Sequence, residues 1–190
     1  MKLLASSLRI SLLFMVLCGL GYNLAVTGIA QIIFPEQADG SLVQDDDGTV
    51  IGSKLIGQLF SEPEYFHGRV SSIDYQADGS GSPNYAPSHP ELMERVTASV
   101  EEWKMNNPEV PVSDVPMDLL TNSASGLDPD ISPEAARAQI PRISRLTGIE
   151  QKQLESLVQE QTTERALGFL GEPAVNVLQL NIGLQRLLAR

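Results

Sequence analysis

One short stretch of the sequence gathers side chains that could do chemistry. Residues 121–136 read TNSASGLDPDISPEAA and combine hydroxyls, a glycine, two aspartates and two prolines. Such a mixture could cradle a phosphate, bind a cation or present a nucleophilic serine. The same residues could also form a tight loop that begins a helix.

The candidates for catalysis in this stretch lack the context that catalysis needs. Ser123 and Ser125 do not stand in a G-x-S-x-G turn, and neither histidine of the chain lies near them in sequence. The paired carboxylates Asp128 and Asp130 could do acid–base work, but the sequence gives no cleft for them. We therefore predict that the chain has no catalytic residue and is not itself an enzyme.

Helix capping explains the second half of the stretch. Ser132 is predicted to be an N-cap, with Pro133 as the first helical residue and Glu134 at the positive end of the helix dipole. Capping does not require both Ser123 and Ser125, so the first half keeps polar groups without an assigned role.

No metal site is predicted. The chain has two histidines, His67 and His89, and a single cysteine, Cys18, which is too few ligands for an ordinary zinc site. The aspartates at residues 45–47 lack the remaining spacing of a calcium loop and fit a solvated hairpin turn better.

The elements that would position these residues begin with a long apolar run. Residues 10–34 contain no charge and would span roughly 37 Å as a helix, whereas a bilayer core needs about 30 Å. A cleaved signal peptide is the alternative, with Gly28–Ala30 as a small-x-small cleavage site. The length of the run favours a retained anchor, residues 1–34, followed by one soluble domain, residues 35–190.

Charge predicts how the anchor is oriented. Lys2 and Arg9 precede the span, and acidic residues follow it from Glu36 onward. Positive flanks stay in the cytoplasm, so the N-terminus is expected inside the inner (plasma) membrane and the C-terminal domain on the periplasmic side. The net charge of −11 disfavours a nucleic-acid partner.

Small residues mark one side of the predicted span. Gly21, Ala25 and Gly28 stand at positions that stack along a helix and would let a partner helix approach closely. Gly and Ala are also common in membrane helices without such a role. We expect packing against another membrane helix here.

The remaining pattern indicates an α+β domain with few strands. A hairpin is expected around Asp47–Gly48, and a short helical segment at residues 53–60. Longer helices are expected at residues 88–106, with Ser88 as the N-cap, and then at residues 133–145, 151–161 and 180–188. Strands are expected at residues 117–121 and 175–178.

The chain resembles a known family, the C subunit of the Kdp-type potassium-transporting P-type ATPase. Each matching segment is weak alone, and their combination over nearly the whole chain is specific. The segments are GSKLIGQLF at 52–60, PEYFHGR at 63–69, SGSPNYAPSHPEL at 80–92, VPMDLLTNSASGLDPDISPEAA at 115–136 and LGFLGEPAVNVLQLN at 167–181. The chain departs from the family's pattern at residues 70–72, in a looser 81–90 loop, and at Asp130, where a histidine is common.

The resemblance implies an accessory subunit of an ATP-driven, high-affinity potassium import complex. Its partners would be a channel-like A subunit, a P-type catalytic B subunit and a small membrane peptide. The subunit would stabilise assembly and could raise the ATP affinity of the catalytic subunit. The chain lacks the Asp-Lys-Thr-Gly phosphorylation motif, so it cannot be the catalytic subunit.

The resemblance leaves the place of ATP open. A nucleotide-binding regulatory module would use Ser123, Ser125 and Asp128 to contact ATP, but the predicted topology keeps these residues away from cytoplasmic ATP. A periplasmic cap over the potassium pathway fits the charge rule better. An unrelated membrane-anchored periplasmic binding domain is the remaining alternative.

Overall fold

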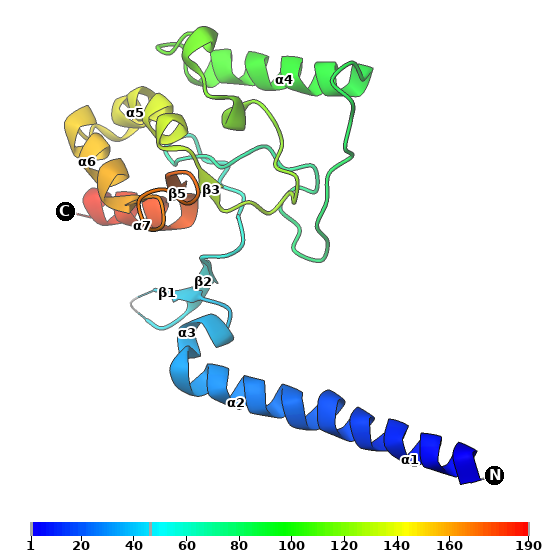
Figure 1. Ribbon diagram of the computed structural model, residues 1–190. Coiled ribbons are helices and arrows are strands. Elements are labelled where there is room, and N and C mark those ends of the chain that lie inside the picture. Colours follow the sequence, from blue (N-terminus) through cyan, green and yellow to red (C-terminus); the bar gives the residue numbers. More distant parts are fainter. Residues whose placement is uncertain (1, 46, 190) are drawn as a thin grey trace. The chain divides into compact units, whose positions relative to one another are not determined.

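The computed structural model describes residues 2–45 and 47–189 and divides into two compact units, Met1–Ser53 and Lys54–Arg190. The first unit begins with a long helix made of α1 (Lys2–Val16), a π-helical segment η1 (Leu17–Tyr22) and α2 (Asn23–Ile33) (Figure 1). The helix from Lys2 to Ile33 is long and apolar enough to cross a membrane, by length and composition. Its length confirms the predicted N-terminal apolar helix.

A short helix and a hairpin complete the first unit. Helix α3 (Pro35–Ala38) is followed by antiparallel strands β1 (Leu42–Gln44) and β2 (Val50–Ser53). The Asp45 carboxylate accepts hydrogen bonds from the backbone N–H of Asp47, at 3.1 Å, and of Thr49, at 2.8 Å. The predicted hairpin is confirmed, although Asp46, part of its predicted turn, lies outside the described residues.

The second unit packs helices beside a small antiparallel sheet of strand order β3-β5-β4. The sheet's strands are β3 (Asp130–Ile131), β4 (Thr162–Thr163) and β5 (Ala174–Asn176), and the helices are α4 (Pro90–Asn106), α5 (Pro133–Thr147), α6 (Gln151–Gln161) and α7 (Val177–Leu188). Short 3₁₀ turns η2 (Val112–Asp114) and η3 (Met117–Leu119) precede β3. The predicted α+β class is therefore confirmed.

The main core lies between α5, α6, α7 and β5. Ile140, Leu154, Val175 and Leu180 are among its buried residues. Phe66, from a segment without helix or strand, is completely buried in the same core. Trp103 of α4 belongs to a second, smaller cluster with Val115 and Leu120.

Three local predictions are wrong for identifiable reasons. Residues 54–60 form no helix, because the Gly57 N–H bonds to the Leu127 carbonyl at 2.9 Å and draws the chain toward the 121–132 loop. Met117–Leu119 is a 3₁₀ turn rather than a strand. The N-cap of α4 is His89 rather than Ser88, and the His89 Nδ1 accepts from the Glu91 N–H at 3.3 Å.

Candidate functional site

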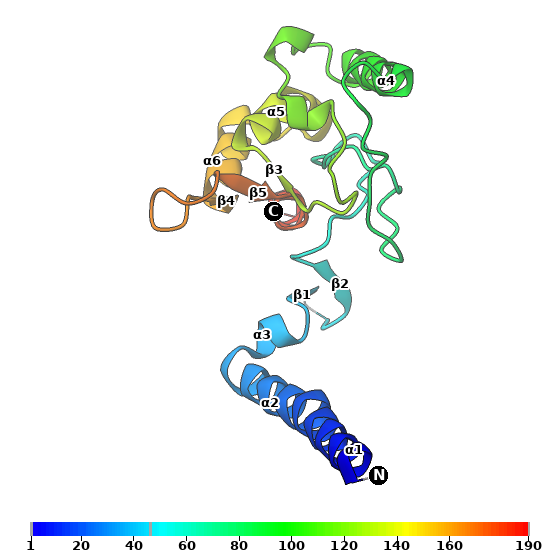
Figure 2. The same ribbon diagram turned by 45° about the vertical axis from the view of Figure 1, so that its right-hand side comes forward.

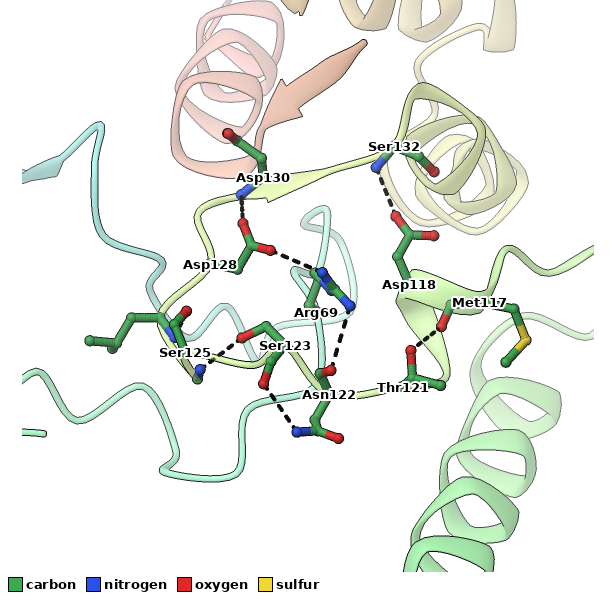
Figure 3. Close-up of polar contacts among 12 residues, drawn as sticks. Arg69, Met117, Asp118, Thr121, Asn122, Ser123, Ser125, Asp128, Asp130 and Ser132 are labelled. Atoms are coloured by element: carbon green, nitrogen blue, oxygen red, sulfur yellow. Dashed lines mark hydrogen bonds and ion pairs between the residues drawn. The ribbon is translucent and has the colours of Figure 1, made fainter. Parts of the chain in front are cut away.

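The three residues predicted to contact a cofactor lie together in one loop and hold its own backbone (Figure 3). The Ser123 Oγ accepts a hydrogen bond from the Gly126 N–H at 2.8 Å, and the Ser125 Oγ accepts from the Leu127 N–H at 3.1 Å. The Asp128 Oδ1 accepts from the Asp130 N–H at 3.2 Å. Ser123 is buried, so its hydroxyl is directed into the loop rather than toward solvent.

An ion pair ties this loop to the irregular segment that contains Tyr65 and Phe66. Arg69 Nη1 lies 3.0 Å from Asp128 Oδ2, and Arg69 Nη2 donates weakly to the Asn122 carbonyl at 3.5 Å (Figure 3). The Ser123 N–H donates to the Val70 carbonyl at 3.0 Å. Both oxygens of the Asp128 carboxylate are therefore engaged by groups of the chain itself.

The second half of the loop begins a helix as predicted. Ser132 is the N-cap of α5, and its Oγ accepts from the Ala135 N–H at 3.0 Å. The Asp118 carboxylate accepts from the Ser132 N–H at 2.8 Å (Figure 3). This cap fixes where the loop ends, so the position of Asp128 depends on α5 as well as on Arg69.

A buried arginine is the main polar feature that the sequence did not reveal. Arg142 is 1 % exposed, and no carboxylate pairs with it among residues 2–45 and 47–189. Its Nε donates to Asn107 Oδ1 at 3.0 Å, and its Nη2 donates to Gln139 Oε1 at 2.7 Å. Its Nη1 donates to the Pro63 carbonyl at 2.5 Å, and its Nη2 also donates to the Tyr65 carbonyl at 3.0 Å. The guanidinium thus fixes an irregular backbone segment.

The side-chain amides of Asn181 and Gln139 hold the same irregular segment by further hydrogen bonds to its backbone. The Asn181 side chain accepts from the Phe66 N–H and donates to the Phe66 carbonyl, both at 2.9 Å. Gln139 accepts from the His67 N–H at 2.8 Å and donates to the His67 carbonyl at 3.0 Å. Buried backbone groups need such partners, and here side chains of α5 and α7 replace a sheet ladder.

The sequence held a weak signal for these three residues. Gln139 and Arg142 alternate with the apolar Ile140 and Ile143 on the buried side of α5, and Asn181 lies among leucines of α7. A polar residue on an apolar helix face indicates a buried hydrogen-bond role. Nothing in the sequence, however, shows that all three side chains reach residues 63–67.

A cleft of about 580 Å³ lies beside the fixed segment. His67, Arg69, Tyr75, Trp103, Asn107 and Arg142 are among the residues that line it. The pKa of Arg142 is lowered to about 10, first by burial and second by repulsion from Arg145. Among the residues the structure describes, no group of three or more His, Cys, Asp or Glu side chains is placed to hold a metal.

The pKa of His67 is lowered from its ordinary value of 6.5, first by burial and then by the Arg142 guanidinium. The unfolded chain therefore takes up a proton as the pH falls through 6.5, and the folded chain does so only at a lower pH. As the pH falls from 6.5 toward the lowered pKa of His67, the free energy of unfolding should therefore decrease, because the unfolded state binds more protons over this range.

We expect His67→Gln to flatten this pH dependence. Urea unfolding of the full chain at about pH 7.5, 6.5 and 5.5 measures it, and the slope between the points gives the difference in bound protons. His89→Gln, at the other histidine of the sequence, is the matched control for the loss of an imidazole outside the cleft. An unchanged slope in His67→Gln would show that other groups cause the loss of stability at low pH.

The apolar helix of the first unit presents the small residues singled out above. Gly21 lies in η1, whereas Ala25 and Gly28 lie in α2, and all three are exposed. A Cβ added at Gly28 would meet nothing within 4 Å, and one at Gly21 would meet only the Val16 carbonyl at 3.8 Å. Asn23 Nδ2 donates to the Gly19 carbonyl of its own helix at 2.7 Å.

Comparison with known proteins supports the family resemblance noted in the sequence. The family model described as K+-transporting ATPase, c chain, matches residues 4–186. The potassium-transporting ATPase KdpC subunit of Bacillus anthracis (strain A0248) is 59 % identical over 187 residues, which is 98 % of this chain and 97 % of that protein. The KdpC subunit of Bacillus cereus (strain Q1) is 60 % identical over 187 residues with the same coverage. The chain therefore belongs to the KdpC family, the c chains of potassium-transporting ATPases.

Proposed function

We propose that this chain holds a potassium-import complex together from the outer side of the membrane. Membership of the family makes it an accessory subunit of a potassium-transporting ATPase. In the proposal, the Lys2–Ile33 helix anchors the chain and packs against a membrane helix of a channel-like or P-type catalytic subunit, or of a small membrane peptide. The soluble domain then lies near the outer mouth of the potassium pathway.

The observation that supports this role best is the exposure of the apolar helix Lys2–Ile33. None of the residues described in α1, η1 and α2 is buried by the rest of the chain. A water-exposed surface of this size would be unfavourable, so lipid and a partner helix are its natural surroundings. The exposed small residues mark the side on which a partner backbone can come close.

We expect Gly28→Leu to weaken assembly without disturbing the helix. The added side chain has free space within the chain but would hold a partner helix away, and losing a close helix contact corresponds to a roughly tenfold drop in association. The measurement is the amount of other pump subunits that copurifies with the tagged full-length chain from detergent-solubilised membranes.

Gly19→Leu is the matched control for this substitution. A Cβ at Gly19 also meets nothing within 4 Å, and Gly19 lies outside the aligned set of small residues. Equal copurification of the wild type and both variants would contradict a partner contact at Gly28. Failure of the wild type to copurify with any pump subunit would contradict the assembly role itself.

A nucleotide-binding regulatory role is the rival proposal, and it would require Ser123, Ser125 or Asp128 to contact ATP. The bonds of these side chains to Gly126, Leu127, Asp130 and Arg69 weigh against it. A photoreactive ATP analogue applied to each face of sealed membrane vesicles tests the rival. Labelling of this chain would support it, and no labelling from either face would remove it.

A further inference from the structure

The loop between β4 and β5 exposes apolar side chains that the soluble domain does not use. In this loop, residues 164–173, Leu167 is 83 % exposed, Phe169 is 69 % exposed and Leu170 is 51 % exposed. Figure 2 shows the loop, in orange, projecting from the helices and the sheet of its unit. Three large apolar side chains at the tip of one loop form a surface that water disfavours.

The loop backbone is nevertheless well fixed by its own hydrogen bonds. The Ala166 N–H donates to the Leu170 carbonyl, and the Leu170 N–H donates back to the Ala166 carbonyl, both at 2.9 Å. The Gly168 N–H donates to the Arg165 carbonyl at 3.0 Å, and Arg165 forms an ion pair with Glu172 across the base. Gly168, at φ +82°, and Leu167, at φ +55°, both occupy the left-handed region.

A rigid, exposed apolar tip has the properties of a binding element. Since its backbone is already ordered, binding would lose little conformational entropy. Aromatic and aliphatic anchors that fill a pocket supply most of the affinity of an interface. Leu167 adopts a backbone conformation that residues with a Cβ rarely adopt. This conformation costs stability, and the largely exposed side chains of Leu167 and Phe169 regain little of it by packing within the chain.

The charges around the tip indicate which kind of partner it fits. Glu164 and Glu172 flank the apolar residues, and Arg165, the single base of the loop, pairs with Glu172. The loop therefore keeps a net charge of −1, in a chain whose net charge is −11. Surface-bound membrane elements instead place basic residues around their apolar groups, because bilayers carry anionic lipids. Within residues 164–173 the base is already paired and the remaining charge is negative, which favours a protein pocket with a basic rim over an anionic lipid surface.

We propose that Leu167, Phe169 and Leu170 insert into an apolar, basic-rimmed recess on another subunit of the potassium-transporting complex. This contact rests on the proposed assembly role and adds a second attachment point to the anchor helix. It would fix the soluble domain directly, whereas the anchor alone only tethers it. The effective concentration created by the anchor means that even a small loop contact can be well populated.

The test uses the tagged full-length chain, coexpressed with the other subunits of its complex. The Leu167→Ala/Phe169→Ala double variant should retain roughly tenfold less of the partner subunits through a detergent wash, as loss of two interface anchors predicts. Its melting temperature should equal that of the wild type, because neither side chain is buried in the chain. Met105→Ala is the control, since Met105 is 75 % exposed outside the loop.

Two results separate this inference from the assembly role. If the wild type retains its partners and the double variant retains them equally well, the loop contact is wrong while the assembly role stands. If the wild type retains none, the assembly role fails first. A photoreactive benzoylphenylalanine at position 169 should crosslink to a protein subunit in native membranes. Crosslinking to lipid alone, or no crosslink, would overturn the proposed pocket.

Discussion

Arg142→Ala is expected to lower the free energy of unfolding of the full chain by roughly 3–5 kcal/mol. The substitution leaves the carbonyls of Pro63 and Tyr65 and the side-chain oxygens of Asn107 and Gln139 without their common donor. It also opens a cavity at a site that is 1 % exposed. Since the guanidinium is paired with neutral oxygens, the loss reports hydrogen bonds rather than an ion pair.

Denaturant unfolding of the full chain in detergent measures this change. Trp103 is the single tryptophan of the sequence and is buried in the same unit, so its fluorescence follows the transition. Arg137→Ala is the control, because Arg137 forms an exposed ion pair with Glu134, and loss of that pair should change stability by less than about 1 kcal/mol. Equal effects of the two substitutions would mean that Arg142 does not support residues 63–67.

Asn181→Leu is expected to cost roughly 2–4 kcal/mol, although leucine is apolar and similar in size. Asn181 is 2 % exposed and makes two hydrogen bonds to the backbone of Phe66, at 2.9 Å each. Leucine would leave both backbone groups buried without a partner. The same fluorescence-detected unfolding experiment applies.

Gln185→Leu is the matched control on the same helix. Gln185 is exposed and donates one hydrogen bond, to the Tyr65 hydroxyl, at 3.2 Å. We expect an effect below about 1 kcal/mol for it. A stability loss for Asn181→Leu no larger than that of Gln185→Leu would show that the Phe66 backbone finds other partners.

Arg142 and Asn181 together explain how an irregular segment can lie inside a core. Phe66 is fully buried, yet residues 62–69 belong to no helix and no strand. Side chains from α5 and α7 supply the hydrogen bonds that a neighbouring strand would supply in a sheet. Arg69 at the end of the segment then reaches Asp128, so the fixed segment also positions the 121–132 loop.

Local patterns in the sequence predicted the helices well where periodicity and capping agreed. The residues 133–145 and 151–161 correspond to α5 and α6, and the Ser132 cap is present with the expected geometry. The closing helix begins three residues earlier than expected, at Val177. Asn176 is its N-cap, and its side chain accepts from the Gln179 N–H at 3.2 Å, a signal that was present in the sequence.

The sequence could not predict the contacts that define the site. The bond from Gly57 to Leu127 and the ion pair from Arg69 to Asp128 join residues far apart in the chain. No periodicity encodes such contacts, because they depend on how complete elements pack. For the same reason the polar groups of Ser123, Ser125 and Asp128 looked available in the sequence, although the fold uses them within the loop.

The orientation of the chain in the membrane decides between the assembly role and the nucleotide role. Lys2 and Arg9 lie in the N-terminal part of the apolar helix, and the acidic residues follow its end. The positive-inside rule predicts that the soluble domain lies outside the cytoplasm, away from ATP. In the proposed orientation Ser123, Ser125 and Asp128 would serve only the loop, and the 164–173 loop would face an extracytoplasmic surface of the complex.

A topology reporter fused after Arg190 tests this account most directly. The full-length chain is joined to an enzyme that is active only outside the cytoplasm, and in parallel to a fluorescent protein that matures only inside it. The account predicts an active external enzyme and no internal fluorescence. Internal fluorescence with an inactive external enzyme would contradict it, because the soluble domain would then face cytoplasmic ATP and could not cap the outer end of the potassium pathway.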